Sequence, residues 1–279
     1  MSEAEAIARG ARLLAKHGIP DPQREARLLW RAAFPRRHVD YEDAMNGGME
    51  RLFDTLVARR CDREPMSHLL GYRDFYEHRF EISGDALDPR PETETLVIAA
   101  LEVPFSDVLD LGTGSGCILL SLLAARPDAA GVGTDLSDKA LAVARRNTAA
   151  LELDHRVALI ASDWFSEVRG TFDLIVSNPP YIAAEEMAVL PPELTYEPRM
   201  ALTDEGDGLS AYRAITIGAG VHLVAGGHLM VEIGWTQGAA VSGMFRAAGF
   251  RDVRILPDLD GRDRVVRGVW HGGQPQKTQ

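Results

Sequence analysis

The stretch Asn178-Pro179-Pro180-Tyr181 has the residue types that suggest chemistry most directly. It follows the apolar run 172–177, and its two prolines fix the backbone and remove two hydrogen-bond donors. A planar amide or exocyclic amino nitrogen is a poor nucleophile, because its lone pair is delocalised. The Asn178 side-chain oxygen and the Pro179 carbonyl could accept its two N–H groups and orient it, with Tyr181 against the flat group. The turn therefore predicts a cradle for a planar NH2 group.

A glycine-rich loop follows another apolar run, directly after Asp110 and Leu111. A dinucleotide-binding fingerprint would need glycine where Cys117 stands, and a P-loop would need Gly-Lys before Ser or Thr. Alternating glycines let a ligand approach the backbone closely. With its preceding aspartate, the loop resembles motif I of class I methyltransferases that use S-adenosylmethionine (SAM). The resemblance makes the whole loop a candidate cofactor contact: Gly112, Thr113, Gly114, Ser115 and Gly116.

Acidic and aromatic residues end the next two predicted strands. Asp135 is suited to accept both hydrogen bonds of a ribose diol, although it could instead cap the following helix, a role that Ser137 could also take. Asp163 could accept from an adenine amino group, and the ring of Trp164 or Phe165 could cover the purine. Ordinary core packing is the alternative for the two aromatic residues. These positions extend the candidate cofactor site.

The elements that must position these residues alternate between strand and helix after residue 107. Nearly continuous apolar runs indicate strands whose two faces are both covered by helices. The last two strands are close enough in sequence to pair antiparallel at the end of the sheet. This pattern predicts an α/β fold with a doubly wound, mostly parallel seven-stranded sheet. Its expected strands are residues 107–112, 130–135, 156–162, 172–178, 225–234, 253–256 and 265–270.

The first 71 residues read as a small helical bundle. Apolar residues recur at helical spacing before Gly18 and again in residues 49–61, and Asp21 with Pro22 predicts an N-cap and first turn. Aromatic and polar residues then alternate as in a β-hairpin. We expect a helical substrate-recognition domain, a hairpin linker, a methyltransferase domain and a flexible tail, at residues 1–71, 72–91, 92–271 and 272–279.

The composition limits the partners and the cellular compartment that we expect for this protein. The 279 residues carry 30 Lys and Arg against 41 Asp and Glu, a net charge of −11, so no bulk basic field favours nucleic acid. Cys61 and Cys117 are isolated, which argues against disulfides and structural zinc. The N-terminus lacks a signal-peptide pattern, and no run is apolar enough to span a membrane. We expect a cytoplasmic enzyme without a metal, and we expect no membrane or direct nucleic-acid partner.

Several longer segments resemble the HemK/PrmC family, the glutamine methyltransferases of peptide chain release factors. The leader segments 63–82 and 87–97 carry the resemblance, as do the motifs Ser-Asp-Trp-Phe, Tyr-Glu-Pro-Arg-Met-Ala-Leu, Asp-Gly-Leu and Glu-Ile-Gly-Trp-Thr-Gln-Gly. The resemblance implies methylation of the glutamine in the Gly-Gly-Gln motif of class I release factors, whose basic surface suits an acidic enzyme. It implies that Asn178 contacts both SAM and substrate, and that Arg90 and Glu92 line the approach. Asp88 departs from the usual Ile or Leu before Pro-Arg-Pro.

Two other functions remain open at this point. The turn also resembles adenine-N6 methyltransferases, although a basic groove or target-recognition domain is not evident. A SAM-binding regulator without activity is the non-enzymatic alternative, which an intact Asn-Pro-Pro-Tyr turn disfavours. The tail contains its own Gly272-Gly273-Gln274, which we interpret as chance, with substrate mimicry as the alternative. Glu232 ends a strand either near the site or facing solvent.

Overall fold

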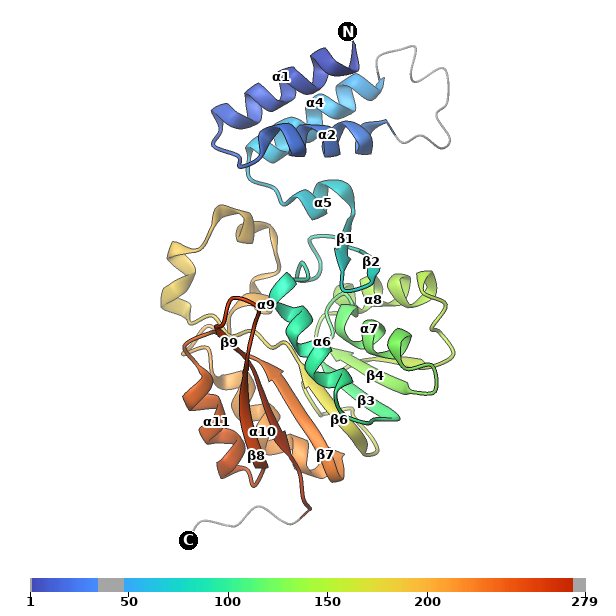
Figure 1. The fold of residues 1–279 in the computed structure, drawn as a ribbon, viewed down its shortest axis with the longest axis vertical. Helices are drawn as coiled ribbons and strands as arrows, with labels where there is room; N and C mark the ends of the chain where they lie inside the picture. Colours follow the sequence, from blue (N-terminus) through green and yellow to red (C-terminus); the bar gives the residue numbers. More distant parts are fainter. Residues whose placement is uncertain (1, 35–47, 273–279) are drawn as a thin grey trace. The chain divides into compact units, whose positions relative to one another are not determined.

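The computed structural model describes residues 2–34 and 48–272. The chain divides into two compact units, Met1–Tyr72 with Pro191–Tyr196 and Arg73–Leu190 with Glu197–Gln279. Figure 1 shows helices in the first unit and a sheet flanked by helices in the second. Within the described ranges, every helix is too short or too polar to cross a bilayer.

The first unit is a helical bundle with its own apolar core. Helix α1 begins with a capping box, in which the Ser2 hydroxyl accepts from the Glu5 amide and the Glu5 carboxylate accepts from the Ser2 amide. Trp30 stacks on Phe34 with ring centroids 3.9 Å apart and meets Phe53 edge-on. The helices are α1 (Glu3–Lys16), α2 (Pro22–Ala33), α4 (Gly48–Cys61) and α5 (Met66–Leu70).

The start of α2 confirms the positions of the expected N-cap and first-turn residues but not a capping hydrogen bond. Pro22 occupies the first turn as predicted, but Asp21 has a φ of 48° and its side chain makes no capping hydrogen bond with a described residue. In this left-handed conformation the carboxylate does not reach the free amides of the first turn. The start of α2 therefore rests on the proline and on the packing of the helix.

A short segment from much later in the chain belongs to this first unit. It forms the 3-10 helix η3 (Pro192–Tyr196). Glu193 lies 3.4 Å from guanidinium nitrogens of both Arg60 and Arg63, and the Tyr196 hydroxyl donates to the Asp62 carbonyl over 2.7 Å. Arg60 is only 5% exposed. A buried guanidinium requires charged partners, and the late segment supplies one of them.

The second unit is built on a seven-stranded sheet in the order β5-β4-β3-β6-β7-β9-β8. Five neighbouring strands run parallel, and β9 pairs antiparallel with both β7 and β8. The predicted fold class is confirmed, including the antiparallel last pair. The strands are β3 (Asp107–Leu111), β4 (Ala130–Asp135), β5 (Val157–Ala161), β6 (Phe172–Ser177), β7 (Leu223–Glu232), β8 (Arg251–Pro257) and β9 (Asp263–Val269).

Helices cover both faces of this sheet. Leu174 and Val176 of β6 pack toward α6 and α7, whereas Ile175 between them packs toward α10 and α11. This alternation within an apolar run is the pattern of a strand buried on both faces. The helices of the unit are α6 (Glu94–Leu101), α7 (Cys117–Ala125), α8 (Asp138–Ala150), α9 (Arg199–Leu202), α10 (Ser210–His222) and α11 (Gly238–Ala247), with 3-10 turns η1 (Pro91–Thr93) and η2 (Ala184–Val189).

A two-stranded sheet precedes α6, as the sequence predicts, and comprises β1 (Tyr72–Phe75) and β2 (His78–Glu81). Asn147 of α8 ties it to the larger sheet. Its Oδ1 accepts from the Glu81 amide over 2.7 Å, and its Nδ2 donates to the Glu81 and Ser115 carbonyls. One buried amide thus fixes the small sheet to the glycine loop.

Strand β4 lets α7 approach closely because two of its positions carry no side chain. A Cβ added to Gly131 would lie 2.6 Å from Leu119 Cδ1 and 3.2 Å from the Val108 carbonyl oxygen. A Cβ on Gly133 would lie 2.8 Å from Leu159 Cδ2 and 3.0 Å from Thr113 Oγ1. The glycines therefore set how near the helix after the glycine loop lies to the sheet.

We predict that Gly131→Ala lowers the free energy of unfolding by about 1–3 kcal/mol, because it overpacks this contact. Gly243→Ala, at an exposed position of α11, is the matched control. An added Cβ there meets no described atom within 4 Å, so the change should raise stability by about 0.4–1 kcal/mol. Urea denaturation measures both, and equal effects of the two substitutions would contradict the packing argument.

Candidate functional site

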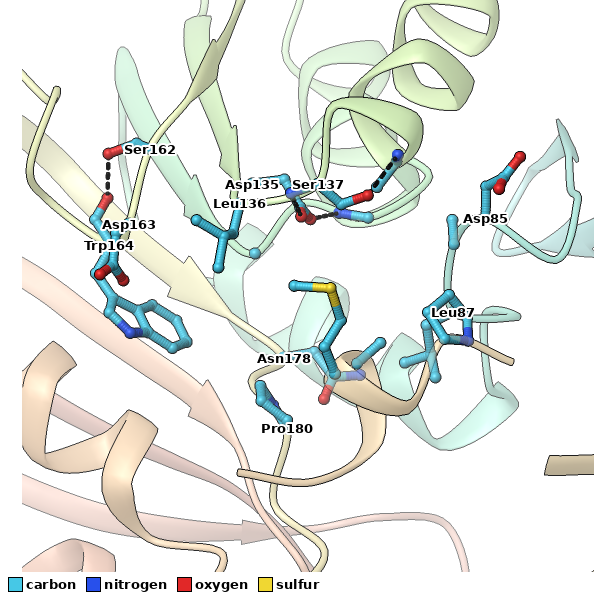
Figure 2. Close-up of a pocket in the computed structure, with 17 residues that line it drawn as sticks. Asp85, Leu87, Asp135, Leu136, Ser137, Ser162, Asp163, Trp164, Asn178 and Pro180 are labelled. Carbon is cyan, nitrogen blue, oxygen red and sulfur yellow. Dashed lines mark hydrogen bonds between the residues drawn. The ribbon is translucent and has the colours of Figure 1, made fainter. Parts of the chain in front are cut away.

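A cavity opens where the carboxyl ends of β3, β4 and β6 meet. Figure 2 shows Leu136 and Trp164 on one side of it, Leu87 on the other, and Asn178 and Pro180 between them. Open α/β sheets bind ligands at this edge. The lining residues are Asp85, Ala86, Leu87, Gly112, Gly114, Asp135, Leu136, Ser137, Ala140, Ser162, Asp163, Trp164, Asn178, Pro180, Pro198, Met200 and Ala201.

The glycine loop presents backbone rather than side chains to this cavity. Gly112 and Gly114 line it, with φ of 69° and 57°, and a Cβ added to either would enter open space. Only glycine adopts such φ values at little cost. Thr113 and Ser115 are buried, and their side chains are not among the groups that line the cavity. Gly116 is the N-cap residue of α7 and has a φ of 83°, so the loop offers a ligand its backbone only.

Asp135 is joined to this loop by hydrogen bonds. Its Oδ2 accepts from the Gly114 amide over 2.9 Å, and its Oδ1 accepts from the Ser137 amide over 2.8 Å. Ser137 caps α8 by accepting from the Ala140 amide, so the alternative role of Asp135 as that cap is wrong. Burial raises the pKa of Asp135, against these backbone bonds. A carboxylate lining the cavity can still accept further hydrogen bonds.

Asp110 lies behind the loop and is fully buried. Its Oδ2 accepts from the Thr113 hydroxyl over 2.7 Å, and the Thr113 amide donates to the Thr134 carbonyl of β4. Burial raises the pKa of Asp110 to about 7, although the Thr113 hydrogen bond opposes the shift. Asp110 and Thr113 therefore shape the turn from inside.

The two consecutive aromatic residues after β5 have different surroundings. Trp164 lines the cavity and has a φ of 46°, which is strained for a bulky residue. The Ser162 hydroxyl donates to the Trp164 carbonyl over 2.9 Å and holds this turn. Phe165 instead stacks on His222, with ring centroids 5.0 Å apart and planes 3° apart. The structure therefore places Trp164 and exposed Asp163 at the cavity, whereas half-buried Phe165 packs against the apolar core and is not among the residues that line the cavity.

Asn178 stands at the base of the cavity, and its side-chain amide is hydrogen-bonded to Thr93. Its Nδ2 donates to the Thr93 hydroxyl over 3.2 Å, and its buried Oδ1 has no hydrogen-bond partner among the described residues. An unpaired buried amide oxygen is costly unless a ligand satisfies it. Pro180 lines the cavity beside it, and Pro179 is buried. The amide oxygen is therefore available to an N–H donor.

Tyr181 is held by Glu232 of β7 and by Gln237, the N-cap residue of α11. Its hydroxyl donates to Glu232 Oε1 over 3.4 Å, and its carbonyl accepts from Gln237 Nε2 over 2.9 Å. A Cβ on Gly208 would lie 2.3 Å from that carbonyl oxygen, so only glycine fits there. Glu232 is 1% exposed, which makes the solvent-facing interpretation of this strand end wrong.

The loop after the cradle is fixed by a second carboxylate. Asp204 accepts from the amides of Gly206 and Gly208 through Oδ1 and of Ser210 through Oδ2. Burial alone would raise the pKa of Asp204, but these hydrogen bonds outweigh it and lower the pKa to about 2. Asp204 therefore stays charged and keeps Gly208 against the Tyr181 carbonyl.

Arg90 and Glu92 have surroundings that the sequence does not reveal. Arg90 Nη2 donates to Glu197 Oε1 over 2.5 Å, and Glu197 is 6% exposed. Asp88 lies 3.7 Å from guanidinium nitrogens of Arg73 and Arg90. These positive charges compensate the Asp88 carboxylate, at the position where the resembling family usually has Ile or Leu. Glu92 is exposed. Neither Arg90 nor Glu92 is among the residues that line the cavity.

Sequence reasoning missed three polar residues of this site. Thr93 binds Asn178, Gln237 binds Tyr181, and Tyr212 donates to the Glu232 carbonyl over 2.9 Å. Thr93 and Gln237 lie in the segments that carry the family resemblance, and this resemblance is the sequence signal that could have found them.

In the ranges that the structure describes, groups of His, Cys, Asp or Glu suited to a metal ion do not occur. Gly273 and Gln274 of the Gly-Gly-Gln tail lie outside these ranges.

Comparison with protein families matches both parts of the chain. A family described as the Methyltransferase small domain matches residues 83–209, and the PrmC N-terminal domain matches residues 5–71. Among curated proteins, the release factor glutamine methyltransferase of Cereibacter sphaeroides is 50% identical over 95% of this chain and 98% of its own. Those of Caulobacter vibrioides and Rhodospirillum rubrum are 44% and 42% identical over 90% and 92% of this chain, and 91% and 82% of their own.

Solved structures share the fold at lower identity. A methyltransferase from Pyrococcus furiosus aligns with a TM-score of 0.54 and 18% identity, over 70% of this chain and 89% of its own. The hMettl16 catalytic domain in complex with a MAT2A 3'UTR hairpin aligns with a TM-score of 0.57 and 18% identity, over 68% and 74%. At this identity the likeness establishes the methyltransferase fold alone.

We predict that Asp110→Asn stabilises the protein in a pH-dependent way. The pKa of Asp110 rises from 3.8 in the unfolded chain to about 7 in the folded one, so the folded state binds more protons between these values and wild-type stability falls across that window. The stability gained by Asp110→Asn should therefore grow from pH 4 to pH 7 and then level off, at no more than about 4 kcal/mol. Chemical denaturation at several pH values tests this, and a gain independent of pH would contradict it.

Proposed function

The chain belongs to the release factor glutamine methyltransferases, and from that premise we propose that it methylates the glutamine of the Gly-Gly-Gln motif in class I peptide chain release factors. The methyl acceptor is the side-chain amide nitrogen of that glutamine, and the donor is SAM. The observation that carries the proposal is Asn178, whose buried Oδ1 lacks a partner among the described residues at the base of the cavity.

The residues at the cavity fit SAM as cofactor. Gly112 and Gly114 leave open space where side chains would stand, Asp135 offers a carboxylate to a ribose diol, and Asp163 with Trp164 offers an acceptor and an indole face to an adenine. Exposed Leu136 adds an apolar contact. When bound, SAM supplies an electrophilic methyl group.

The Asn-Pro-Pro-Tyr turn fits an amide substrate. Asn178 Oδ1 accepts one N–H of the substrate amide, and the Pro179 carbonyl, held on a rigid backbone, accepts the other. These two bonds orient the nitrogen and favour its pyramidal form as charge develops. A charged base is unnecessary, because the nitrogen loses its proton readily once it is alkylated. Tyr181 borders the flat group, with its hydroxyl fixed on Glu232.

Methyl transfer from labelled SAM to a purified release factor tests the function. We expect label in the tryptic peptide that contains Gly-Gly-Gln, and none in a release factor whose motif glutamine is replaced by alanine. Duplex DNA and RNA serve as the parallel substrates for an adenine methyltransferase. Label entering nucleic acid but not the release factor would overturn the proposal, and cofactor binding without transfer to any substrate would favour a regulator.

We predict that Asn178→Ala and Asp135→Ala separate turnover from cofactor binding. Asn178→Ala should lower kcat by about 100-fold or more, since it removes a group that orients the nitrogen. Asp135→Ala should weaken binding of S-adenosylhomocysteine by about 10- to 100-fold, the effect of losing a charge-assisted hydrogen bond. Calorimetry and single-turnover kinetics measure the two effects, and equal loss of binding and turnover in both variants would refute the division of roles.

A further inference from the structure

The two prolines remove hydrogen-bond donors from the backbone of the Asn-Pro-Pro-Tyr turn. Pro179 and Pro180 have no amide hydrogen, and under the proposed function the Pro179 carbonyl is used by the substrate. Directly after the prolines, the Tyr181 carbonyl accepts from Gln237 Nε2 over 2.9 Å. Gln237 therefore holds the backbone where the turn ends.

The side-chain amide of Gln237 joins four separate parts of the chain. Its Nε2 donates to the Tyr181 carbonyl and, over 3.3 Å, to the Gly208 carbonyl. Its Oε1 accepts from the Gly234 amide over 3.0 Å and lies 3.3 Å from the Tyr212 hydroxyl. These partners belong to the turn, the loop before α10, the segment after β7 and α10 itself. One amide thus ties the turn to three neighbouring segments.

The direction of the Gln237 amide is settled by its backbone partners. A backbone carbonyl can only accept a hydrogen bond, and a backbone N–H can only donate one. The Tyr181 and Gly208 carbonyls therefore face the NH2 side of the amide. The Gly234 N–H faces its oxygen. Rotating the amide by half a turn would bring like groups together at all of these contacts, and a carboxylate, which only accepts, would not fit the two carbonyls.

The Gln237 side chain has a matching space and a fixed backbone. A Cβ on Gly208 would lie 3.1 Å from Nε2 of Gln237, and a Cβ on Gly234 would lie 3.0 Å from its Oε1. The amide thus fits between two positions that carry no side chain. Gln237 is the N-cap residue of α11, its own N–H donates to the Gly234 carbonyl over 2.8 Å, and its carbonyl accepts from the Val241 amide over 3.0 Å. The side chain therefore extends from backbone that is held on both sides.

We propose that Gln237 is a positioning residue, which fixes the Tyr181 end of the turn so that the Pro179 carbonyl and the Tyr181 ring meet the substrate amide. The consequence for catalysis rests on the proposed function, whereas the anchoring is a property of the free protein. Gln237 is not among the described residues that line the cavity. Its effect should therefore reach the substrate through the turn and leave the cofactor site unchanged.

Two replacements of similar size test this role by kinetics on the release factor. Gln237→Met removes the donors and the acceptor, and Gln237→Glu keeps an acceptor but removes the donors. Each should lower kcat by about 10- to 100-fold at about pH 8, because a displaced turn misaligns the substrate, with unchanged affinity for S-adenosylhomocysteine. Gln23→Glu, at an exposed position of α2, is the matched control and should keep the wild-type kcat. A wild-type kcat in Gln237→Met would overturn the proposal.

Protonation distinguishes a lost hydrogen bond from a general loss of structure. A protonated carboxyl group has one O–H donor, and burial against two carbonyls should raise the pKa of the carboxyl group introduced by Gln237→Glu. Lowering the pH from about 8 to about 6 should therefore restore the bond to Tyr181. The ratio of the Gln237→Glu kcat to the wild-type kcat should rise severalfold over this range, and a constant ratio would count against the positioning role.

The ratio is used because other groups near Gln237 are charged or titrate. Burial raises the pKa of Glu232 to about 7, which lies inside the same pH range. This titration occurs in both proteins and cancels in the ratio. The charged or titratable groups of the surrounding elements are Tyr181, Asp204, Tyr212, Glu232, Asp263 and Arg264.

Hydrogen exchange tests the anchoring without cofactor or substrate. The Ile182 amide directly follows the turn and donates to the Leu202 carbonyl over 3.0 Å. This amide should exchange faster in Gln237→Met than in the wild type, and Gln23→Glu should leave its exchange unchanged. If a melting curve shows that Gln237→Met fails to fold, Gln237→Glu carries both tests.

The outcomes separate the anchoring from the proposed function. Equal exchange of the Ile182 amide in the wild type and Gln237→Met would refute the anchoring. A wild type that leaves the release factor unmethylated would instead refute the proposed function, while the exchange result would still decide whether Gln237 holds the turn.

Discussion

The parallel register of β3, β4, β5 and β6 is the constraint on which the rest of the structure depends. Leu111 pairs with Thr134 on one side and Ser177 on the other, and Asp135 pairs with Ala161. A slip of one residue in any pair would turn every following side chain to the other face of the sheet. The register therefore delivers the glycine loop, the acidic residues and the proline turn to one edge, whatever the length of the segments between them.

The pKa values of the carboxylates around this edge differ with how deeply each is buried and with the number of donors that reach it. Asp204 receives three amide hydrogen bonds and keeps its charge to about pH 2, whereas Asp110 and Glu232 are fully enclosed and have pKa values of about 7. Charged groups with several donors are fixed anchors, and those with few are sensitive to their surroundings. The loop behind Tyr181 is thus anchored by a permanent charge, and the turn itself by a titratable one.

The sequence predicted most of the fold and several residues that line the cavity, because both depend on local patterns. Apolar runs marked the strands of the sheet to within a few residues, and the glycine loop and the turn were found from residue types alone. The missing parts depend on distant contacts or unusual backbone. Arg90 meets Glu197 more than 100 residues later. Trp164 has a left-handed φ and is the one of the two aromatic residues that lines the cavity. The left-handed φ of Asp21 explains why its side chain makes no capping hydrogen bond with a described residue.

The short segment Pro191–Tyr196 gives the two compact units a connectivity that their order in the sequence conceals. The chain passes between the units at residues 72–73, again at 190–191, and returns at 196–197, directly before residues 198–201 that contribute to the cavity wall. A fragment that begins after residue 72 would keep this segment but lose the arginines that hold Glu193. The helical unit is therefore not encoded by one continuous stretch of the gene. Recombination between relatives could exchange it intact only by replacing two separate stretches together, the one that encodes residues 1–72 and the one that encodes residues 191–196.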